Sequence, residues 1–271
     1  MKFRRSSVVA AAAACGALLF CAGPARGQTT PDAGTAGLTA GVGQDTDPTK
    51  PVLFSLREEY YSLPNGNWIN NFILRKDEIV WKQETFPGQA RGVLLRMELP
   101  ETTAHFGGES EGGLGDGYVQ ALLLPRLSGP FLLAAGTGLV LPTATERVLG
   151  GGKWTIAPVL APAWLVPRQR YAFVKFQEFE SFAGPSSRPD VSFLLITPTF
   201  MTRVMRRYWV LVDSESRTDW TRGSVTSFKS GLLVGTMFTP RVGLSVKAEV
   251  PWGNHRLGQW NLKASLFWTR F

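Results

Sequence analysis

The chain contains little cysteine and little histidine, and each shortage excludes a class of chemistry. Its two cysteines, Cys15 and Cys21, both lie in an N-terminal segment that we expect to be removed. The mature protein is then expected to hold no disulfide, no catalytic thiolate and no cysteine zinc site. Two histidines, His105 and His255, leave few candidates for general acid-base catalysis.

The chain also lacks an apolar run long enough to form a membrane-spanning helix. Residues 8–22 are apolar, but about fifteen residues fall short of the roughly 20 that such a helix needs. Lys2, Arg4 and Arg5 precede this run, and Ala25-Arg26-Gly27 follows it with small residues where a signal peptidase cuts. We therefore expect a signal peptide over 1–27 and an exported protein.

After the signal, 28–50 is rich in Thr, Gly, Ala, Asp and Pro, which favours a flexible linker. The formal net charge of +8 includes four bases of the signal, so the mature chain carries 25 bases and 21 acids, or +4. That charge is too small to indicate nucleic-acid binding.

No helical periodicity is evident after Pro51, and two-residue alternation recurs instead. In 241–250, Val242, Leu244, Val246 and further apolar residues share one face, opposite polar and charged ones. This pattern predicts β-strands. We expect strands at 51–62, 67–76, 91–99, 115–124, 130–142, 153–165, 170–181, 190–201, 206–216, 224–235, 241–250 and 258–271.

Strand length and loop length favour a transmembrane β-barrel over a soluble sandwich, which would also alternate. The expected strands match the roughly 9 to 11 residues of a membrane-crossing strand, and their number is even. From the third strand onward long connections, such as 100–114 and 143–152, alternate with short ones, such as 125–129. We predict an all-β, antiparallel up-and-down barrel of about twelve strands over 51–271, in the outer membrane.

The first hairpin fits this scheme less well, because 77–90 should be a short inner turn. Either the second strand continues to about Trp81 or the count is wrong by a pair. Aromatic residues lie mostly near expected strand ends, as interfacial girdles do. The terminal Phe271 resembles the last residue of other outer-membrane barrels, which end with an aromatic residue. This resemblance implies that the barrel assembly machinery recognises the C-terminal strand and inserts the barrel into outer-membrane lipid. We expect a monomer.

Two Gly-rich stretches invite a nucleotide-binding interpretation. Gly150-Gly-Gly-Lys153 lacks the spacing of a phosphate-binding P-loop and leads into a strand, so we interpret it as a loop. The stretch 107–117 also leads into a strand, where a dinucleotide fingerprint needs a helix. Glu109, Glu111 and Asp116 leave calcium binding open, and otherwise we expect no metal and no cofactor.

Four segments, in their order along the chain, resemble an outer-membrane family labelled for the meta-pathway of phenol degradation. They are Leu95-Arg-Met-Glu-Leu-Pro100, Gly113-Leu-Gly-Asp116, Gly136-Thr-Gly-Leu-Val-Leu-Pro-Thr143 and Leu149-Gly-Gly-Gly-Lys-Trp154. The resemblance covers roughly 52–271. It implies a barrel that takes up small, often aromatic molecules, and it supplies no catalytic residues.

Charged residues opposite apolar faces must point into the barrel, because each would cost roughly 2 to 4 kcal/mol against lipid near the midplane. The candidate lumen-lining residues are Arg96, Glu98, Lys175, Gln177, Lys229, Arg241, Lys247, Glu249 and Lys263. They either form a channel wall whose basic excess favours anions, or pair with one another and fill an occluded lumen.

We therefore expect a non-enzymatic barrel that passively transports or binds a small solute, with an aromatic compound as the candidate that the resemblance suggests. One alternative is a structural or interaction barrel with an occluded lumen. A second is a barrel acyl hydrolase, in which Ser110 or Ser224 would have to approach His105.

Overall fold

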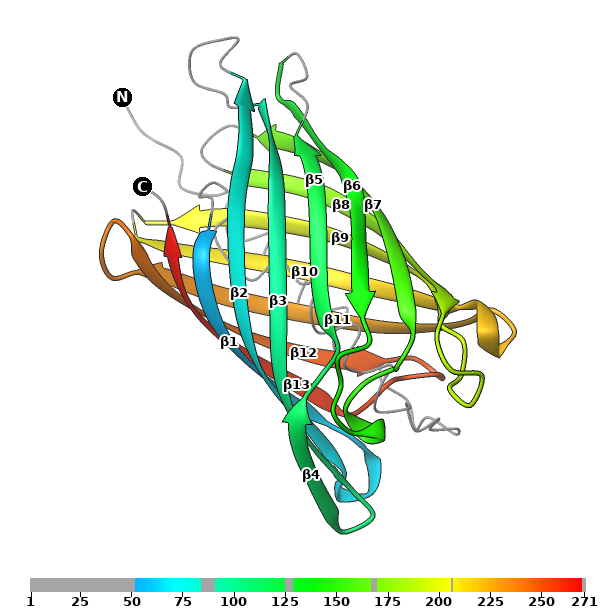
Figure 1. The fold of residues 1–271 in the computed structure, drawn as a ribbon. Coiled ribbons are helices and arrows are strands. Elements are labelled where there is room, and N and C mark those ends of the chain that lie inside the picture. Colours follow the sequence, from blue (N-terminus) through cyan, green and yellow to red (C-terminus); the bar gives the residue numbers. More distant parts are fainter. Residues whose placement is uncertain (1–51, 84–90, 125–128, 167–169, 206, 270–271) are drawn as a thin grey trace, which may run out of the picture.

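The computed structural model describes residues 52–83, 91–124, 129–166, 170–205 and 207–269. The expected signal peptide and linker, and Phe271, lie outside the described residues. Figure 1 shows a barrel of long, tilted strands. The strands are β1 (Val52–Ser62), β2 (Trp68–Gln83), β3 (Arg91–Phe106), β4 (Glu109–Leu114), β5 (Gly117–Leu124), β6 (Phe131–Leu141), β7 (Trp154–Val166), β8 (Arg170–Ala183), β9 (Ser192–Val204), β10 (Tyr208–Asp219), β11 (Val225–Met237), β12 (Val242–Trp252) and β13 (Trp260–Thr269).

The sheet is antiparallel and closed. Each strand from β5 to β12 pairs with the next one along the chain, β13 pairs with β1, and β1 to β3 complete the circle. Both β4 and β5 pair with β3, as successive parts of one barrel strand interrupted at Gly115 and Asp116. Thirteen strand segments therefore make twelve barrel strands, and the predicted antiparallel barrel of about twelve strands is confirmed.

Two predicted boundaries need correction at the first hairpins. The strand β2 continues to Gln83, so the first of the two explanations for the long segment 77–90 holds. The predicted long loop 100–114 is wrong, because β3 continues to Phe106 and turns at Gly107 and Gly108 into β4. Glycines in that stretch indicated a loop, whereas here they form a hairpin that projects beyond the barrel (Figure 1).

The two ends of the barrel differ. β1 begins and β13 ends at the same end, which also carries the short turn from Met237 to Val242. The opposite end carries the longer connections and the 3-10 helices η2 (Pro64–Gly66), η3 (Arg147–Leu149) and η4 (Trp220–Arg222). We call these the inner and outer ends, as expected for an outer-membrane barrel. No helix in the described part of the chain is long and apolar enough to cross a membrane.

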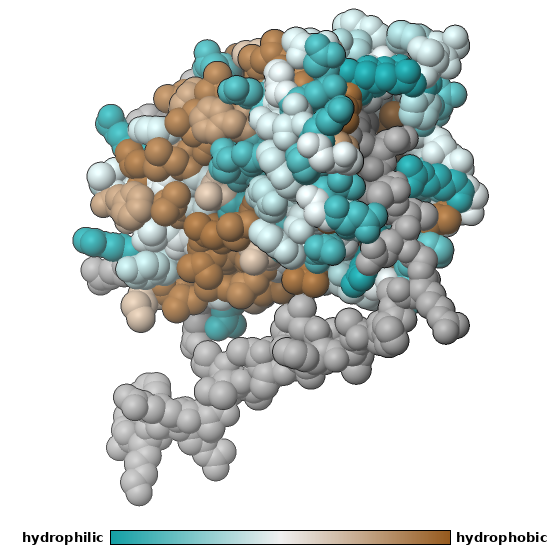
Figure 2. All heavy atoms as spheres, turned by 90° about the horizontal axis from the view of Figure 1, so that it is seen from below, coloured by the Kyte–Doolittle hydropathy of each residue, from teal (hydrophilic) through white to brown (hydrophobic). Residues whose placement is uncertain are grey.

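Apolar side chains cover the outside of the barrel. Along β12, Val246 and Val250 are exposed, whereas Lys247 and Glu249 are buried inside. Figure 2, seen from below the view of Figure 1, shows apolar side chains gathered toward one side of the molecule and hydrophilic ones toward the other. A closed sheet of an even number of strands with this exterior is the structure of an outer-membrane barrel, which gives the cellular location.

Aromatic rings form part of a girdle near the outer end. Tyr60 stacks on Trp68 with ring centroids 6.0 Å apart and also contacts Trp260, and Trp68 stacks on His105. These rings belong to β1, β2, β13 and β3, so the row crosses four neighbouring strands. Rings of this kind anchor a barrel where lipid meets water.

Clusters of apolar side chains also pack inside the barrel toward both ends. Near the inner end, Trp209 and Phe267 pack with Met201, Leu211 and Leu233. Their rings lie over glycines of neighbouring strands: a Cβ on Gly235 would lie 2.1 Å from the Trp209 ring, and one on Gly243 would lie 2.4 Å from the Phe267 ring. The glycines therefore let large rings lie flat against the wall.

Candidate functional site

A network of ion pairs lines one side of the lumen. In β1 and β3, Arg57 Nε lies 2.6 Å from Glu59 Oε1, and Arg57 Nη2 lies 3.2 Å from Glu98 Oε2. Glu98 is directly opposite Arg75 across β2 and β3, and Asp77 is directly opposite Arg96 in the same pair of strands. Register therefore sets these contacts, with Arg96 Nε 3.2 Å from Asp77 Oδ1.

The network continues through β10 to β13. Lys247 Nζ lies 2.5 Å from Asp213 Oδ2 and 2.6 Å from Glu249 Oε1. Lys229, directly opposite Glu215, lies 3.1 Å from its Oε1.

Lys263 joins the two parts of the network across the seam between β13 and β1. Its Nζ lies 3.3 Å from Glu249 Oε2 and 3.9 Å from Glu59 Oε1. The strands β10 to β13 and β1 to β3 thus carry one continuous set of ion pairs, which we call the ion ladder.

The ion ladder is balanced in charge. Its members are six bases and six acids, Arg57, Arg75, Arg96, Lys229, Lys247, Lys263, Glu59, Asp77, Glu98, Asp213, Glu215 and Glu249. The predicted basic excess is therefore not found on this wall. Alternation in 51–62, 67–76 and 206–216 could have indicated five of the six ladder residues that were not predicted on β1, β2 and β10. The sixth, Asp77, lies in the continuation of β2 beyond the predicted strand.

One glycine makes room for the densest part of the ladder. A Cβ on Gly231 would lie 2.6 Å from Lys247 Cε, 2.7 Å from Asp213 Oδ1 and 3.1 Å from Glu249 Cγ. Separations under 3.0 Å are too short for such atoms, so any side chain at this position would displace the ion pairs.

The opposite wall is mainly uncharged. Tyr118, on β5, accepts hydrogen bonds at its hydroxyl from Gln120 Nε2 at 2.8 Å and Gln177 Nε2 at 2.9 Å. Nearby, the Phe193 ring stacks on Phe179 at 4.7 Å, and the Arg217 guanidinium carbon lies 3.8 Å from the Phe193 ring centre. This wall offers amide and hydroxyl groups beside aromatic rings.

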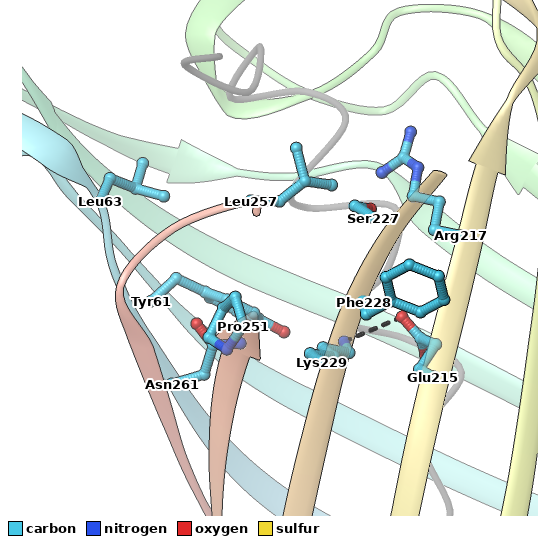
Figure 3. A pocket seen from close by; sticks show the side chains of 10 residues that line it. All are labelled: Tyr61, Leu63, Glu215, Arg217, Ser227, Phe228, Lys229, Pro251, Leu257 and Asn261. Atoms are coloured by element: carbon cyan, nitrogen blue, oxygen red, sulfur yellow. Dashed lines mark ion pairs between the residues drawn. The ribbon is translucent and has the colours of Figure 1, made fainter. Parts of the chain in front are cut away.

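A small cavity lies in the outer half of the barrel beside the ion ladder. Its volume is about 40 Å³, which holds a few water molecules. Figure 3 shows the ion pair between Lys229 and Glu215 at this space, with Arg217 and Tyr61 also lining it. The full lining is Tyr61, Leu63, Glu215, Arg217, Ser227, Phe228, Lys229, Pro251, Leu257 and Asn261.

The connection between β6 and β7 folds inward at the outer end. Leu149 is buried against lumen-facing apolar residues of β1, β2 and β3, among them Tyr61, Ile69, Ile73 and Ala104. Val148 packs against the same cluster. This connection, which we call the mouth loop (142–153), narrows the outer opening.

Asp116 fixes the mouth loop. Its Oδ1 accepts the amide N–H of Ala144, and its Oδ2 accepts those of Gly151 at 2.6 Å and Gly152 at 3.2 Å. The Gly150-to-Lys153 stretch is a loop, as predicted, and its amides hold the carboxylate of this same chain. Both oxygens of Asp116 accept backbone N–H groups, which does not favour a cation there. No group of three or more possible metal-ligating residues occurs among the described residues.

The predicted lumen residues are placed as follows. Arg96, Glu98, Lys229, Lys247, Glu249 and Lys263 belong to the ion ladder, and Lys175 and Gln177 lie on the interior face of β8. Arg241 requires a correction, because it is exposed in the inner turn before β12. Thr239 Oγ1 accepts the N–H groups of Arg241 and Val242 there, which delays the start of the strand.

His105 lies in β3 and not in a loop, which corrects its predicted location. Its Nδ1 lies 2.8 Å from Ser110 Oγ, because the two residues are directly opposite in the β3–β4 hairpin. A serine hydrolase also needs a group that orients the histidine. In the described part of the chain no carboxylate or amide side chain hydrogen-bonds His105, and its ring stacks on Trp68. This pair lacks the third member of a catalytic triad.

The fold and the lumen define the protein as a transmembrane β-barrel of the outer-membrane type. No model of a known protein family matches the chain, and no curated protein sequence matches it. Solved structures do match: an outer membrane channel from Pseudomonas putida F1 is similar with a TM-score of 0.66 at 12% identity, over 83% of this chain and 97% of that one.

Two further solved barrels resemble the chain. The KdgM porin, solved in complex with disordered oligogalacturonate, has a TM-score of 0.52 at 8% identity, over 80% of this chain and 99% of that one. The translocator domain of the autotransporter NalP from Neisseria meningitidis has a TM-score of 0.51 at 10% identity, over 97% and 96%. At these identities the likeness establishes the fold.

Proposed function

We propose that the protein is a passive outer-membrane channel for a small solute. The observation that carries the proposal is the contrast between an apolar exterior and a lumen lined by the ion ladder and by Tyr118, Gln120 and Gln177. A lumen with this many polar groups supports the passage of water-soluble molecules. Two of the similar barrels are a channel and a porin, which agrees with this role.

Aromatic solutes form the finer part of the proposal. The resemblance to the phenol-pathway family suggests them, and the lumen carries aromatic rings toward both ends, with Tyr118, Phe179 and Phe193 in the outer half and Trp209 and Phe267 near the inner end. These rings are almost fully buried in the structure, so a planar solute would stack on them only where neighbouring side chains move aside as it passes. No catalytic step is part of this proposal.

Swelling of proteoliposomes tests both levels of the proposal. Vesicles would be shifted into isotonic solutions of an uncharged aromatic alcohol, a sugar and a larger oligosaccharide. We expect swelling with the small solutes, fastest with the aromatic alcohol relative to protein-free vesicles, and none with the oligosaccharide. Equal rates for the alcohol and the sugar would contradict the aromatic preference alone, whereas no swelling with any solute would contradict the channel.

An occluded structural or interaction barrel is the second candidate. The mouth loop favours it, since Leu149 is 2% exposed, and so does the burial of the ladder side chains inside the barrel. A barrel of this kind would leave the vesicles impermeable to every solute. The same swelling experiment therefore separates the two functions.

A further inference from the structure

We propose that the ion ladder is a charge-compensated wall, so that the channel discriminates weakly between cations and anions, favours uncharged solutes, and depends on Glu249 for this neutrality. This inference rests on the proposed channel function and adds the charge class of its solute. It opposes the anion preference that the basic residues in the sequence indicated.

Glu249 is the centre of the ladder. Its two carboxylate oxygens lie 2.6 Å from Lys247, 3.3 Å from Lys263 and 3.7 Å from Lys229. Lys247 and Lys263 are directly opposite across β12 and β13, where two like charges would repel each other. The carboxylate between them removes that repulsion, and its side chain is almost fully buried.

Each of the three lysines also has a second acidic partner. These partners are Asp213 for Lys247, Glu215 for Lys229 and Glu59 for Lys263. The loss of Glu249 therefore weakens the compensation of all three lysines at once, while each of them stays held in place by its remaining partner. Substitution of Glu249 therefore changes the charge balance around three lysines at once.

Pairing at these distances cancels the field that a passing ion would experience. Opposite charges 2.5 to 3.9 Å apart act as small dipoles, whose potential falls off faster with distance than that of a single charge. Most of the ladder side chains are buried, so salt screens these pairs only weakly and the compensation depends on the pairing itself. A solute in the lumen therefore meets a polar wall with little net charge.

The wall across from the ladder adds little charge. Its inward groups include the Tyr118 hydroxyl, the Gln120 and Gln177 amides and the Phe193 ring. Lys175 contributes a positive charge on β8 and is attracted electrostatically by Glu215. Beside this wall, on β10, Arg217 Nη2 lies 3.5 Å from Asp219 Oδ2, and this pair adds no net charge. Hydrogen-bonding groups and rings without a dominant sign suit an uncharged polar or aromatic molecule.

Reversal potentials in planar bilayers under a salt gradient test the inference. We expect a cation-to-anion permeability ratio within about twofold of one for the unmodified mature protein. Glu249→Gln should shift the ratio toward anions by on the order of threefold, because it leaves three lysines under-compensated. Lys247→Gln should shift it toward cations, because Asp213 and Glu249 then lose a counter-charge.

The double substitution Glu249→Gln with Lys247→Gln removes one charge of each sign, so it should return the ratio close to that of the unmodified protein. Glu58→Gln is the matched control: Glu58 lies on β1 beside Glu59 but is exposed on the outside of the barrel, where it accepts a hydrogen bond from Asn70. We expect this control to leave the ratio unchanged.

The outcomes separate this inference from the function on which it rests. Conductance with a strong preference for one sign of ion, or equal ratios for Glu249→Gln and Lys247→Gln, overturns the compensated wall and leaves the channel function intact. Absence of conductance in the unmodified protein, together with vesicles impermeable to every solute, overturns the channel and the inference together. Permeability ratios that shift in opposite directions in the two single variants, and return to the unmodified value in the double variant, support the compensated wall.

Discussion

At the scale of single residues, close packing explains the Gly-rich segments that could be mistaken for ligand-binding motifs. Asp116 places its carboxylate among the amides of the mouth loop, and the neighbouring glycines leave no room for a side chain. A Cβ on Gly150 would lie 2.6 Å from Asp116 Cγ. The amides of this loop therefore bind an anion supplied by the protein itself.

Two adjacent glycines of β4 should respond differently to alanine. A Cβ on Gly113 would lie 2.2 Å from Thr145 Oγ1 in the mouth loop, whereas one on Gly112 would lie 3.6 Å from Thr103 Oγ1, an ordinary contact. We expect Gly113→Ala to lower the free energy of unfolding by about 1 to 3 kcal/mol. Urea titration in lipid vesicles measures this change. Gly112→Ala is the control, and an equal loss there would contradict the packing argument.

Asp116 should give the mouth loop a dependence on pH. Burial raises the pKa of this carboxyl above its usual 3.8, although three amide donors and Arg188 oppose the rise. The folded protein binds this proton more tightly than the unfolded chain does, so protonation of Asp116 stabilises the fold at low pH. This stabilisation is lost as the pH rises through the pKa that Asp116 has in the folded protein. The stability advantage of the unmodified protein over Asp116→Asn should therefore shrink as the pH rises from about 4.

Urea titrations of both proteins at several pH values measure this difference, and other carboxyl groups cancel in the comparison. Asp116→Asn should also be less stable throughout, because its amide group faces the Gly151 and Gly152 N–H donors. An advantage of the unmodified protein that grows with pH would show that hydrogen bonding to the ionised form outweighs burial.

At the scale of elements, alternation predicted most strands within a few residues, because a barrel wall between lipid and a polar lumen imposes a period of two. Where alternation failed, so did the boundaries. Pro100 and the glycines after it interrupt the pattern, and yet β3 continues to Phe106 because β2 and β4 pair with it there. The inward fold of the mouth loop depends on contacts with distant strands, which local sequence does not encode.

The mouth loop should be a fixed constriction. Thr145 Cβ lies 3.5 Å from the position of a Cβ on Gly113, which is within the range for a disulfide. The expected mature chain has no other cysteine, so Gly113→Cys with Thr145→Cys should form a single crosslink on oxidation. We expect the same single-channel conductance before and after reduction of this crosslink. An increase on reduction would show instead that the loop opens during conduction.

At the scale of the whole molecule, the barrel places the charges of the ion ladder on the lumen side of the wall, where lipid cannot reach them. The direction of the charged side chains of β3, β11, β12 and β13 followed from the sequence, because a charge facing lipid is costly. Their mutual compensation did not, since it depends on register across the seam between β13 and β1, where Lys263 meets Glu59. Counting charges along the chain gave a basic excess, and pairing in three dimensions removes it from this wall.

Single-channel recording of the purified mature protein in a planar lipid bilayer tests the central claim most directly. The account predicts discrete current steps in symmetrical potassium chloride, because the apolar exterior holds the barrel in the bilayer and its polar lumen leads ions across. A folded barrel that inserts into the bilayer and carries no current would contradict it.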